Sequence, residues 1–371
     1  MRQIDYGLFL NVLALLIIGL LAVASATKAN ADIPDRFFYV KRQVFWIVLG
    51  AGAAFLAMVI DYGLLSRWAR LLYYLNLGLL LAVLVVGRSA LGAQRWIQIG
   101  PFPLQPSEFA KIAIIITLAN YLSTREDKLK RLRDLLPAFW HVTLPMLLIL
   151  KQPDLGTSLV FAGVLLGILF LAGVSPRLLF YIFGGGLAAI VLAIFLHFHL
   201  GLWLPLKDYQ LMRLVVFINP EVDPLGAGYH IIQSRIAIGS GGLWGKGLFA
   251  GTQNQLDFLP EQHTDFIFSV ISEELGFFGS LTVLFLQFTL IWRALKIAAA
   301  AKDRLGLLLA GGIASMFLFH VFVNAGMTMG IMPVVGIPLP FVSYGGSALL
   351  TNSLAIGLLQ NIWIRRQKIL F

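Results

Sequence analysis

Long apolar runs, each close to the length of a membrane-spanning helix, recur along the whole chain. We place ten of them, at residues 7–26, 43–60, 70–87, 107–123, 138–150, 155–173, 178–200, 264–292, 305–330 and 344–364. A helix needs roughly 20 apolar residues to cross a bilayer. The apolar–polar alternation that marks the strands of a transmembrane barrel is not seen in these runs. The pattern predicts an all-α polytopic membrane protein with about ten transmembrane helices, in which residues 1–371 form one integral membrane domain.

The connection between the seventh and eighth runs, residues 201–263, is the longest in the chain. Loops of this length without a domain of their own are usually functional. It carries aromatic and charged residues among many glycines, so we expect short amphipathic pieces packed over the mouth of the membrane domain. We predict a large extracytoplasmic loop between helices 7 and 8.

Composition and charge agree with this class and set the orientation. The chain is 59% hydrophobic and only 12% charged, which excludes a water-soluble globular protein. Of 28 Lys and Arg residues, 16 fall on the side of the two termini and seven in the short connections of the other side. Because basic residues gather on the cytoplasmic side, both termini are predicted to be cytoplasmic. The net charge of +10 is then explained by topology, and no nucleic-acid partner is expected. The absence of cysteine excludes disulfides and thiolate chemistry.

A first polar cluster precedes and opens the fourth run. Pro106 and Ser107 predict the start of a helix there, with Ser107 as its cap. Glu108 and Lys111 are three residues apart and share a helix face. They are either a structural ion pair or a cationic site near the outer surface, in which Glu108 positions Lys111. Trp96, just upstream, is either an interfacial aromatic residue or part of that site.

A second polar cluster opens the eighth run, where Glu261, His263 and Asp265 fall within five residues. Thr264 or His263 could cap the helix, and Asp265 would then lie in its first turn, where the helix dipole stabilises a carboxylate. The alternative is that Asp265 is a general base or a metal ligand at the boundary between water and lipid. A His-x-Asp pattern alone is a weak metal signal, since common sites need three or four ligands.

Two further loops could contribute to a site. The glycine-rich stretch 239–247, which includes Lys246, is either a diphosphate cradle built from backbone N–H groups or a flexible turn. The segment 336–347, which includes Ser343, is predicted to line a cavity, because irregular backbone at this depth needs protein or water around it. Glu273, Glu274 and His320 are expected to be structural residues.

Taken together, these motifs resemble those of the SEDS family (shape, elongation, division and sporulation) over nearly the whole chain. The strings that carry the resemblance are Arg95-Trp96, Gln105 to Lys111, Leu259 to Phe268, Glu273 to Gly276 and Pro338 to Gly346. Asn219-Pro220-Glu221 and residues 223–229 are similar to the elongation members. The resemblance implies a peptidoglycan glycosyltransferase that polymerises lipid II during cell-wall elongation. It implies a site on the outer face of the bacterial cytoplasmic (inner) membrane. It also implies a class B penicillin-binding protein and the elongation machinery as partners.

The resemblance also assigns roles to residues. The essential acidic residue of the family falls on Asp265, the expected general base of an inverting transfer. Other functional positions fall on Trp96, Glu108, Lys111 and Arg213. Lys246, Glu261, His263 and Ser343 complete the expected substrate-binding set. Family activity depends on a divalent cation, Mg²⁺ or Mn²⁺, but the sequence shows no complete metal site, with Asp265 as the candidate ligand. A lipid II flippase or transporter and a non-catalytic scaffold are the alternatives.

Overall fold

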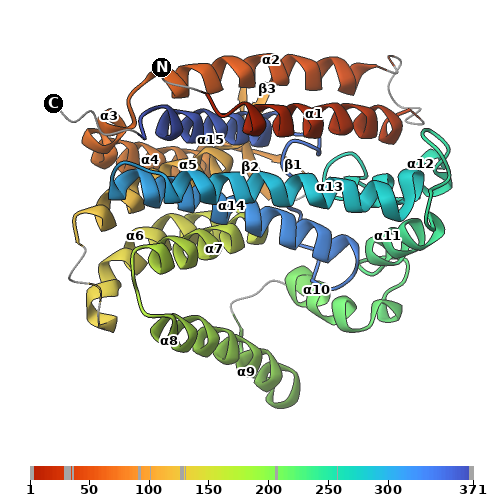
Figure 1. Ribbon diagram of the computed structural model, residues 1–371. Helices are drawn as coiled ribbons and strands as arrows, with labels where there is room; N and C mark the ends of the chain where they lie inside the picture. Colours follow the sequence, from red (N-terminus) through yellow and green to blue (C-terminus); the bar gives the residue numbers. More distant parts are fainter. Residues whose placement is uncertain are drawn as a thin grey trace.

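The protein is a bundle of long apolar helices, seen in a computed structural model that describes residues 4–28, 35, 37–90, 93–100, 102–125, 129, 131–204, 208–256 and 258–366 (Figure 1). Within these ranges, eight helices are long and apolar enough to cross a membrane. They are α1 (Tyr6–Ala26), α2 (Phe38–Val59), α4 (Ala69–Val86), α6 (Leu132–Lys151), the continuous α8–η2–α9 (Pro176–Leu200), α13 (Ile267–Ala299), α14 (Arg304–Thr328) and α15 (Gly346–Ile364).

Two more helices occupy the remaining positions of the predicted spans. They are α5 (Pro106–Ser123), most of which is buried, and α7 (Leu155–Leu171), which has 17 residues. The predicted class, an all-α integral membrane protein, is confirmed. The number of ten spans and the side on which the 201–263 loop lies stay predictions.

The centre of the bundle is α14, which packs against α13, α7 and α5. Small residues allow this close approach. A methyl group added at Gly312 would lie within 3.0 Å of the side chains of Ile168 and Ile115, and one at Gly311 would meet Leu171 at 1.9 Å. Helices in a membrane associate through such close van der Waals packing. The central position of α14 matters below, because two of its polar side chains reach the site.

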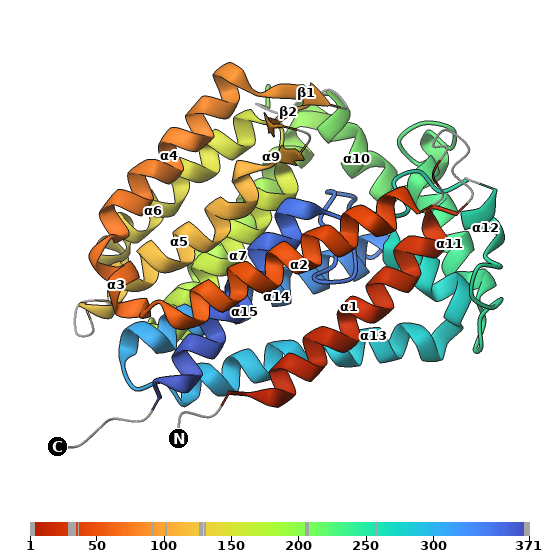
Figure 2. The ribbon, with the colours of Figure 1, turned by 90° about the horizontal axis from the view of Figure 1, so that it is seen from above.

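The two ends of the described chain lie side by side (Figure 2). The backbone N–H of Asp5 donates to Gln360 Oε1 at 3.0 Å, and Gln360 Nε2 donates back to the Asp5 carbonyl at 2.8 Å. Arg293, on α13, also pairs with the Asp5 carboxylate at 2.7 Å. The start of α1 and the end of α15 therefore share one side of the bundle, as the expected topology requires.

The segment between α4 and α5 departs from the all-helical expectation. It forms a small antiparallel sheet in the order β1 (Arg88–Ala90), β2 (Ala93–Ile99), β3 (Phe102–Leu104). Trp96 lies on β2, opposite Arg88. Alternating residues in a seven-residue strand are too short a signal to stand out beside runs of 20 apolar residues.

Several predicted boundaries are also wrong. The cap of α5 is Gln105 and not Ser107. The cap of α13 is Phe266, so Asp265 precedes that helix and does not lie in its first turn. α6 runs through Pro137 and Pro145 and is longer than its predicted span at both ends. The α13 helix is interrupted at Gly276, whose φ of 64° and ψ of −159° are not helical.

The region 201–263 consists of short helices, as expected. They are α10 (Asp208–Ile218), the 3₁₀ turn η3 (Pro220–Val222), α11 (Tyr229–Ser240) and α12 (Thr252–Gln255). The remaining helices are α3 (Tyr62–Arg67) and the parts of the seventh span, α8 (Pro176–Leu179), the π turn η2 (Phe180–Gly184) and α9 (Gly185–Leu200). In Figure 1 the α8–α9 rod stands away from the bundle, and no residue of α9 is buried.

Candidate active site

A cavity of about 690 Å³ lies between the bundle and the 201–263 region. Its walls come from β2, α5, α7, α10, α11, α14 and the segments 260–266 and 334–348. Six of the nine predicted site residues line it: Trp96, Glu108, Lys111, Arg213, Glu261 and Asp265. Residues that are far apart in the sequence are thus brought to one chamber.

Asp265 sits in a tight turn that presents its carboxylate to the cavity. The carbonyl of Glu261, a residue with a positive φ of 51°, accepts from the N–H groups of Thr264 and Asp265, each at 3.2 Å. Strained turns of this kind are common at functional sites. A methyl group added at Gly336 would lie 3.0 Å from Asp265 Oδ2, so only glycine allows this loop to approach the carboxylate so closely.

The carboxylate of Asp265 accepts no hydrogen bond and makes no ion pair with any other described residue. Burial and, to a smaller extent, the negative charge of Glu261 raise the pKa of Asp265 to about 7, against the opposing effect of Arg213 and Arg95. A carboxylate with a pKa near neutral pH is well suited to take up a proton and release it again.

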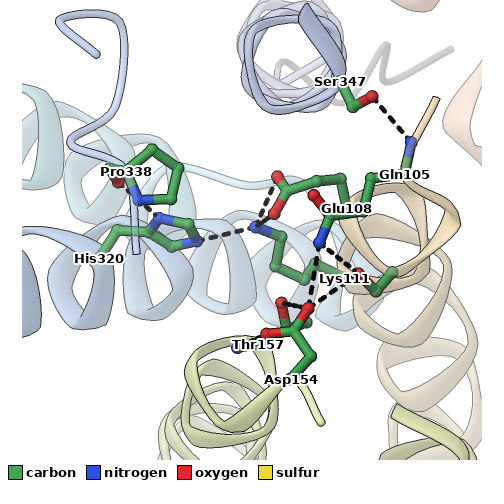
Figure 3. Close-up of polar contacts among 9 residues, drawn as sticks. Gln105, Glu108, Lys111, Asp154, Thr157, His320, Pro338 and Ser347 are labelled. Atoms are coloured by element: carbon green, nitrogen blue, oxygen red, sulfur yellow. Dashed lines mark hydrogen bonds and ion pairs between the residues drawn. The ribbon is translucent and has the colours of Figure 1, made fainter. Parts of the chain in front are cut away.

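Lys111 and Glu108 form a buried ion pair in another part of the cavity wall (Figure 3). Lys111 Nζ lies 2.8 Å from each oxygen of the Glu108 carboxylate and 3.0 Å from His320 Nε2, and its side chain is 1% exposed. An ammonium group has three donors. All three are directed at protein atoms, so the pair predicted from spacing is present but Lys111 has no donor left for a ligand.

The start of α5 is fixed by a residue that the sequence did not single out, Asp154 (Figure 3). Asp154 Oδ2 accepts from Gln105 Nε2 at 3.0 Å, from Ser107 Oγ at 3.2 Å and from Thr157 Oγ1 at 3.0 Å. Its Oδ1 also caps α7 through the N–H of Thr157. One carboxylate therefore joins α5 to α7 beside the cavity.

Two guanidinium groups face the same chamber as Asp265. Arg213 extends from α10 and lies 5.7 Å from the ring of Tyr209, and burial lowers its pKa. Arg95, on β2, is held by the backbone carbonyls of Gln152, at 3.0 Å from Nε, and Pro153. Arg95 was not among the predicted site residues. Its place next to Trp96 in the sequence was the available signal.

Three predicted site residues are not part of the cavity wall. Lys246 Nζ donates to Glu273 Oε1 and Thr252 Oγ1, both at 2.7 Å. Ser343 Oγ accepts from the N–H of Leu339 at 2.8 Å. The His263 ring packs against Tyr39 and Tyr344, with ring centres 4.7 and 5.5 Å away. Their proposed contacts with substrate remain predictions, but the structure gives each one a local structural partner.

The glycine-rich stretch is fastened to α13 and is not a flexible turn. The N–H of Lys246 donates to the Glu273 carbonyl at 3.0 Å, and that of Gly247 donates to the Glu274 carbonyl at 2.9 Å. Because these two amides bind the protein itself, they are not available for the diphosphate cradle that was one of the two alternatives. The structural role expected for Glu273 and Glu274 agrees with these contacts.

The acidic residues around the cavity suit a cation shared with a substrate better than a preformed metal site. Among the described residues, no three His, Asp or Glu side chains are grouped as a metal site would require. Mg²⁺, however, is often held by one or two carboxylates together with substrate phosphates and water. Asp265 and Glu261, whose charges interact, fit that pattern.

Comparison with known proteins places the chain in a family. Residues 6–368 match the model of the FtsW, RodA and SpoVE family, described as cell cycle protein. The chain belongs to this family. The resemblance to the SEDS family is thereby confirmed, and the similarity to its elongation members is confirmed by the relatives that follow.

Individual relatives cover the chain almost completely. It is 43% identical to the peptidoglycan glycosyltransferase MrdB of Escherichia coli over 366 residues, covering 98% of this chain and 95% of the relative. The rod shape determining protein RodA of Thermus thermophilus has a similar structure, with a TM-score of 0.71, 30% identity and coverage of 100% and 99%. A chain from a peptidoglycan synthase complex that coordinates polymerization and crosslinking matches with a TM-score of 0.80, 34% identity and 98% coverage of both.

Proposed function

We propose that this chain polymerises lipid II in the cavity described above, with Asp265 as the general base. That the chain is a peptidoglycan glycosyltransferase follows from its family and from relatives of that name at about 40% identity over its whole length. The proposal concerns the substrate and the chemistry. The observation that supports it best is an unpaired carboxylate, with a raised pKa, facing a chamber that also holds two arginines.

The chemistry requires one inversion. The donor sugar is α-linked to a lipid diphosphate, and the product linkage is β-1,4. The acceptor hydroxyl oxygen forms a bond to C1 of the donor as the bond from C1 to the diphosphate oxygen breaks. The hydroxyl proton passes to Asp265, and the lipid diphosphate leaves with the electron pair. A base of this kind contributes about 10²–10⁴-fold to a rate.

The leaving diphosphate needs positive charge. The basic residues of the cavity differ in whether a carboxylate already neutralises them. Lys111 is neutralised by Glu108 and has no free donor, so its field on a ligand is small. Arg213 and Arg95 face the cavity without a carboxylate partner among the described residues. Guanidinium groups bind phosphate oxygens through paired hydrogen bonds. We therefore assign the diphosphate to Arg213 and Arg95, and a supporting position to the Lys111–Glu108 pair.

A divalent cation would be held by Glu261, beside Asp265, whose carboxylate stays free to act as the base. Bound there, Mg²⁺ or Mn²⁺ would neutralise the charge that develops on the leaving group. In this arrangement Asp265 takes the proton and Glu261 orients the turn that carries it. Trp96 offers an aromatic face to a sugar or to the first carbons of the lipid.

The proposal also includes the membrane in which the reaction takes place and the partner protein. The chain is an integral membrane protein, and we place it in the bacterial inner membrane with the cavity open to the outer face. We expect a class B penicillin-binding protein as the partner that crosslinks the strands during cell-wall elongation. The supporting observations are the excess of basic residues on the side of the termini and the similarity to a chain of a synthase complex.

The direct test is incubation of purified lipid II with the purified protein, with and without a penicillin-binding partner, followed by separation of the products by length. Glycan strands longer than the substrate are expected. If the protein instead moves labelled lipid II across vesicles and forms no strands, the flippase alternative replaces this proposal. If it does neither while cells still require it, the scaffold alternative does.

A further inference from the structure

Two polar side chains of α14 connect the parts of the cavity wall that carry Lys111 and Asp265. His320 and Asn324 are four residues apart, so they lie on one face of the helix. They are 1% and 0% exposed. His320 lies at the cavity wall and Asn324 behind it, and each bonds to two different segments of the chain.

The hydrogen bonds of His320 fix its protonation. The Lys111 ammonium has no lone pair, so His320 Nε2, 3.0 Å away, must accept from it. The proton of the neutral ring is then on Nδ1, which donates to the carbonyl of Pro338 at 3.1 Å. Figure 3 shows the ring between Lys111 and the Pro338 loop. His320 thus completes the coordination of Lys111 and attaches it to that loop.

Asn324 makes the corresponding connection to the base. Its Nδ2 donates to the backbone carbonyl of Asp265 at 2.9 Å and to that of Ile337 at 2.7 Å. Both amide hydrogens are used. The turn that carries Asp265 and the loop that carries Ile337 and Pro338 are therefore held by one side chain, one helical turn from His320.

We propose that His320 and Asn324 are positioning residues that set the distance between Asp265 and the Lys111–Glu108 wall. Both side chains belong to the central helix α14. His320 donates to the carbonyl of Pro338 and Asn324 to that of Ile337, the preceding residue of the same loop. The groups that line the two parts of the wall are then held relative to each other through the bonds that these two side chains make to the protein. This inference rests on the proposed function, because it concerns the geometry of that reaction.

The test compares an apolar with a polar replacement of the histidine. His320→Leu keeps a side chain in place but removes both hydrogen bonds. His320→Gln keeps an acceptor for Lys111 and a donor for Pro338. We expect His320→Leu to lower kcat by about 10–100-fold, the scale of a misplaced catalytic group, with KM changed less than about threefold. His320→Gln should recover most of the lost kcat.

Controls separate positioning from folding. The thermal midpoint of each purified variant in detergent measures the fold. His141→Leu is the matched control, since this histidine also makes a hydrogen bond, to Thr117 Oγ1, but does not line the cavity. It should leave kcat per folded molecule unchanged. Equal kcat for His320→Leu and His320→Gln, or a loss that follows the folded fraction alone, overturns the inference.

A variant of Asn324 keeps the inference testable if the His320 variant does not fold. If His320→Leu does not fold, Asn324→Ser decides, since serine is too short to bind both carbonyls. A fall in kcat of about tenfold or more at constant KM supports the inference, and an unchanged kcat overturns it. In all these experiments the wild type must polymerise lipid II. If it does not, the proposed function has failed and not the positioning role.

Discussion

Two carboxylate sites, eight residues apart in the sequence, differ completely in what surrounds them. Glu273 is fully buried and accepts from Lys246 Nζ, from Thr252 Oγ1 and from two backbone N–H groups. Asp265 accepts nothing from the other described residues and faces a cavity. The carboxylate of Glu273 thus has hydrogen-bond donors around it, whereas that of Asp265 has none among the described residues.

The difference separates a structural use of a carboxylate from a chemical one. A saturated carboxylate holds together the segments that donate to it, here the glycine-rich stretch and α12, which it joins to α13. An unsatisfied carboxylate costs stability and binds protons more tightly, which makes it a better base near neutral pH. Hydrogen bonding, and not proximity in sequence, therefore identifies the candidate for catalysis.

The largest effect is expected from removing the base. Asp265→Asn keeps the size of the side chain but cannot take up a proton, so polymerisation should fall by about 10²–10⁴-fold. Strand formation from lipid II measures this, and the thermal midpoint should stay close to that of the wild type. A variant that polymerises normally would remove Asp265 from the mechanism.

Glu273 should behave in the opposite way. Glu273→Ala leaves several buried donors without an acceptor and should destabilise the protein by about 3 kcal/mol, at the lower end for a broken buried pair because Lys246 keeps some access to water. The thermal midpoint measures it, and activity per folded molecule should change little. Glu221→Ala, at an exposed glutamate, is the control and should shift stability by less than about 0.5 kcal/mol. A stable but inactive Glu273→Ala would erase the contrast between the two sites.

Gly276 tests how tightly the glycine-rich stretch is fastened to α13. An added methyl group would meet Gly245 N at 2.3 Å, and the φ of 64° is unfavourable for any other residue. Gly276→Ala should cost about 1–3 kcal/mol. Gly52→Ala, in α2, has open space around the new methyl group and serves as control. Equal thermal midpoints for the two variants would show that this contact is dispensable.

The smallest effect concerns pH. Since only deprotonated Asp265 acts as a base and its pKa is about 7, the rate should rise with pH through neutrality. Glu261→Gln removes a negative charge that raises this pKa, so the rise should move to lower pH. Because Glu261 is exposed and screened, we expect less than about one pH unit. Glu221→Gln makes the same charge change elsewhere and should leave the pH–rate profile of polymerisation where it is. A shift to higher pH in Glu261→Gln would contradict the assignment.

The sequence predicts the elements and contacts whose residues are close together along the chain. It does not predict contacts between residues that only folding brings together. The helices were predicted because each is a long apolar run, and the Glu108–Lys111 pair because its members share a helix face. His320 was interpreted as a structural residue, since its partner Lys111 is 209 residues away. Lys246 was assigned to substrate because its partner, Glu273, is reached only after the 201–263 region has folded back onto α13.

The α8–α9 rod has a consequence for work with the purified protein. No residue of α9 is buried by the described chain, so in the purified protein acyl chains or detergent are expected to surround this helix. Lipid tails are as apolar as leucine side chains, and a helix in contact with them adjusts its tilt to the thickness of the hydrocarbon layer. The tilt of this helix is therefore expected to respond to the thickness of the host membrane. Acyl-chain length is therefore an experimental variable for this enzyme.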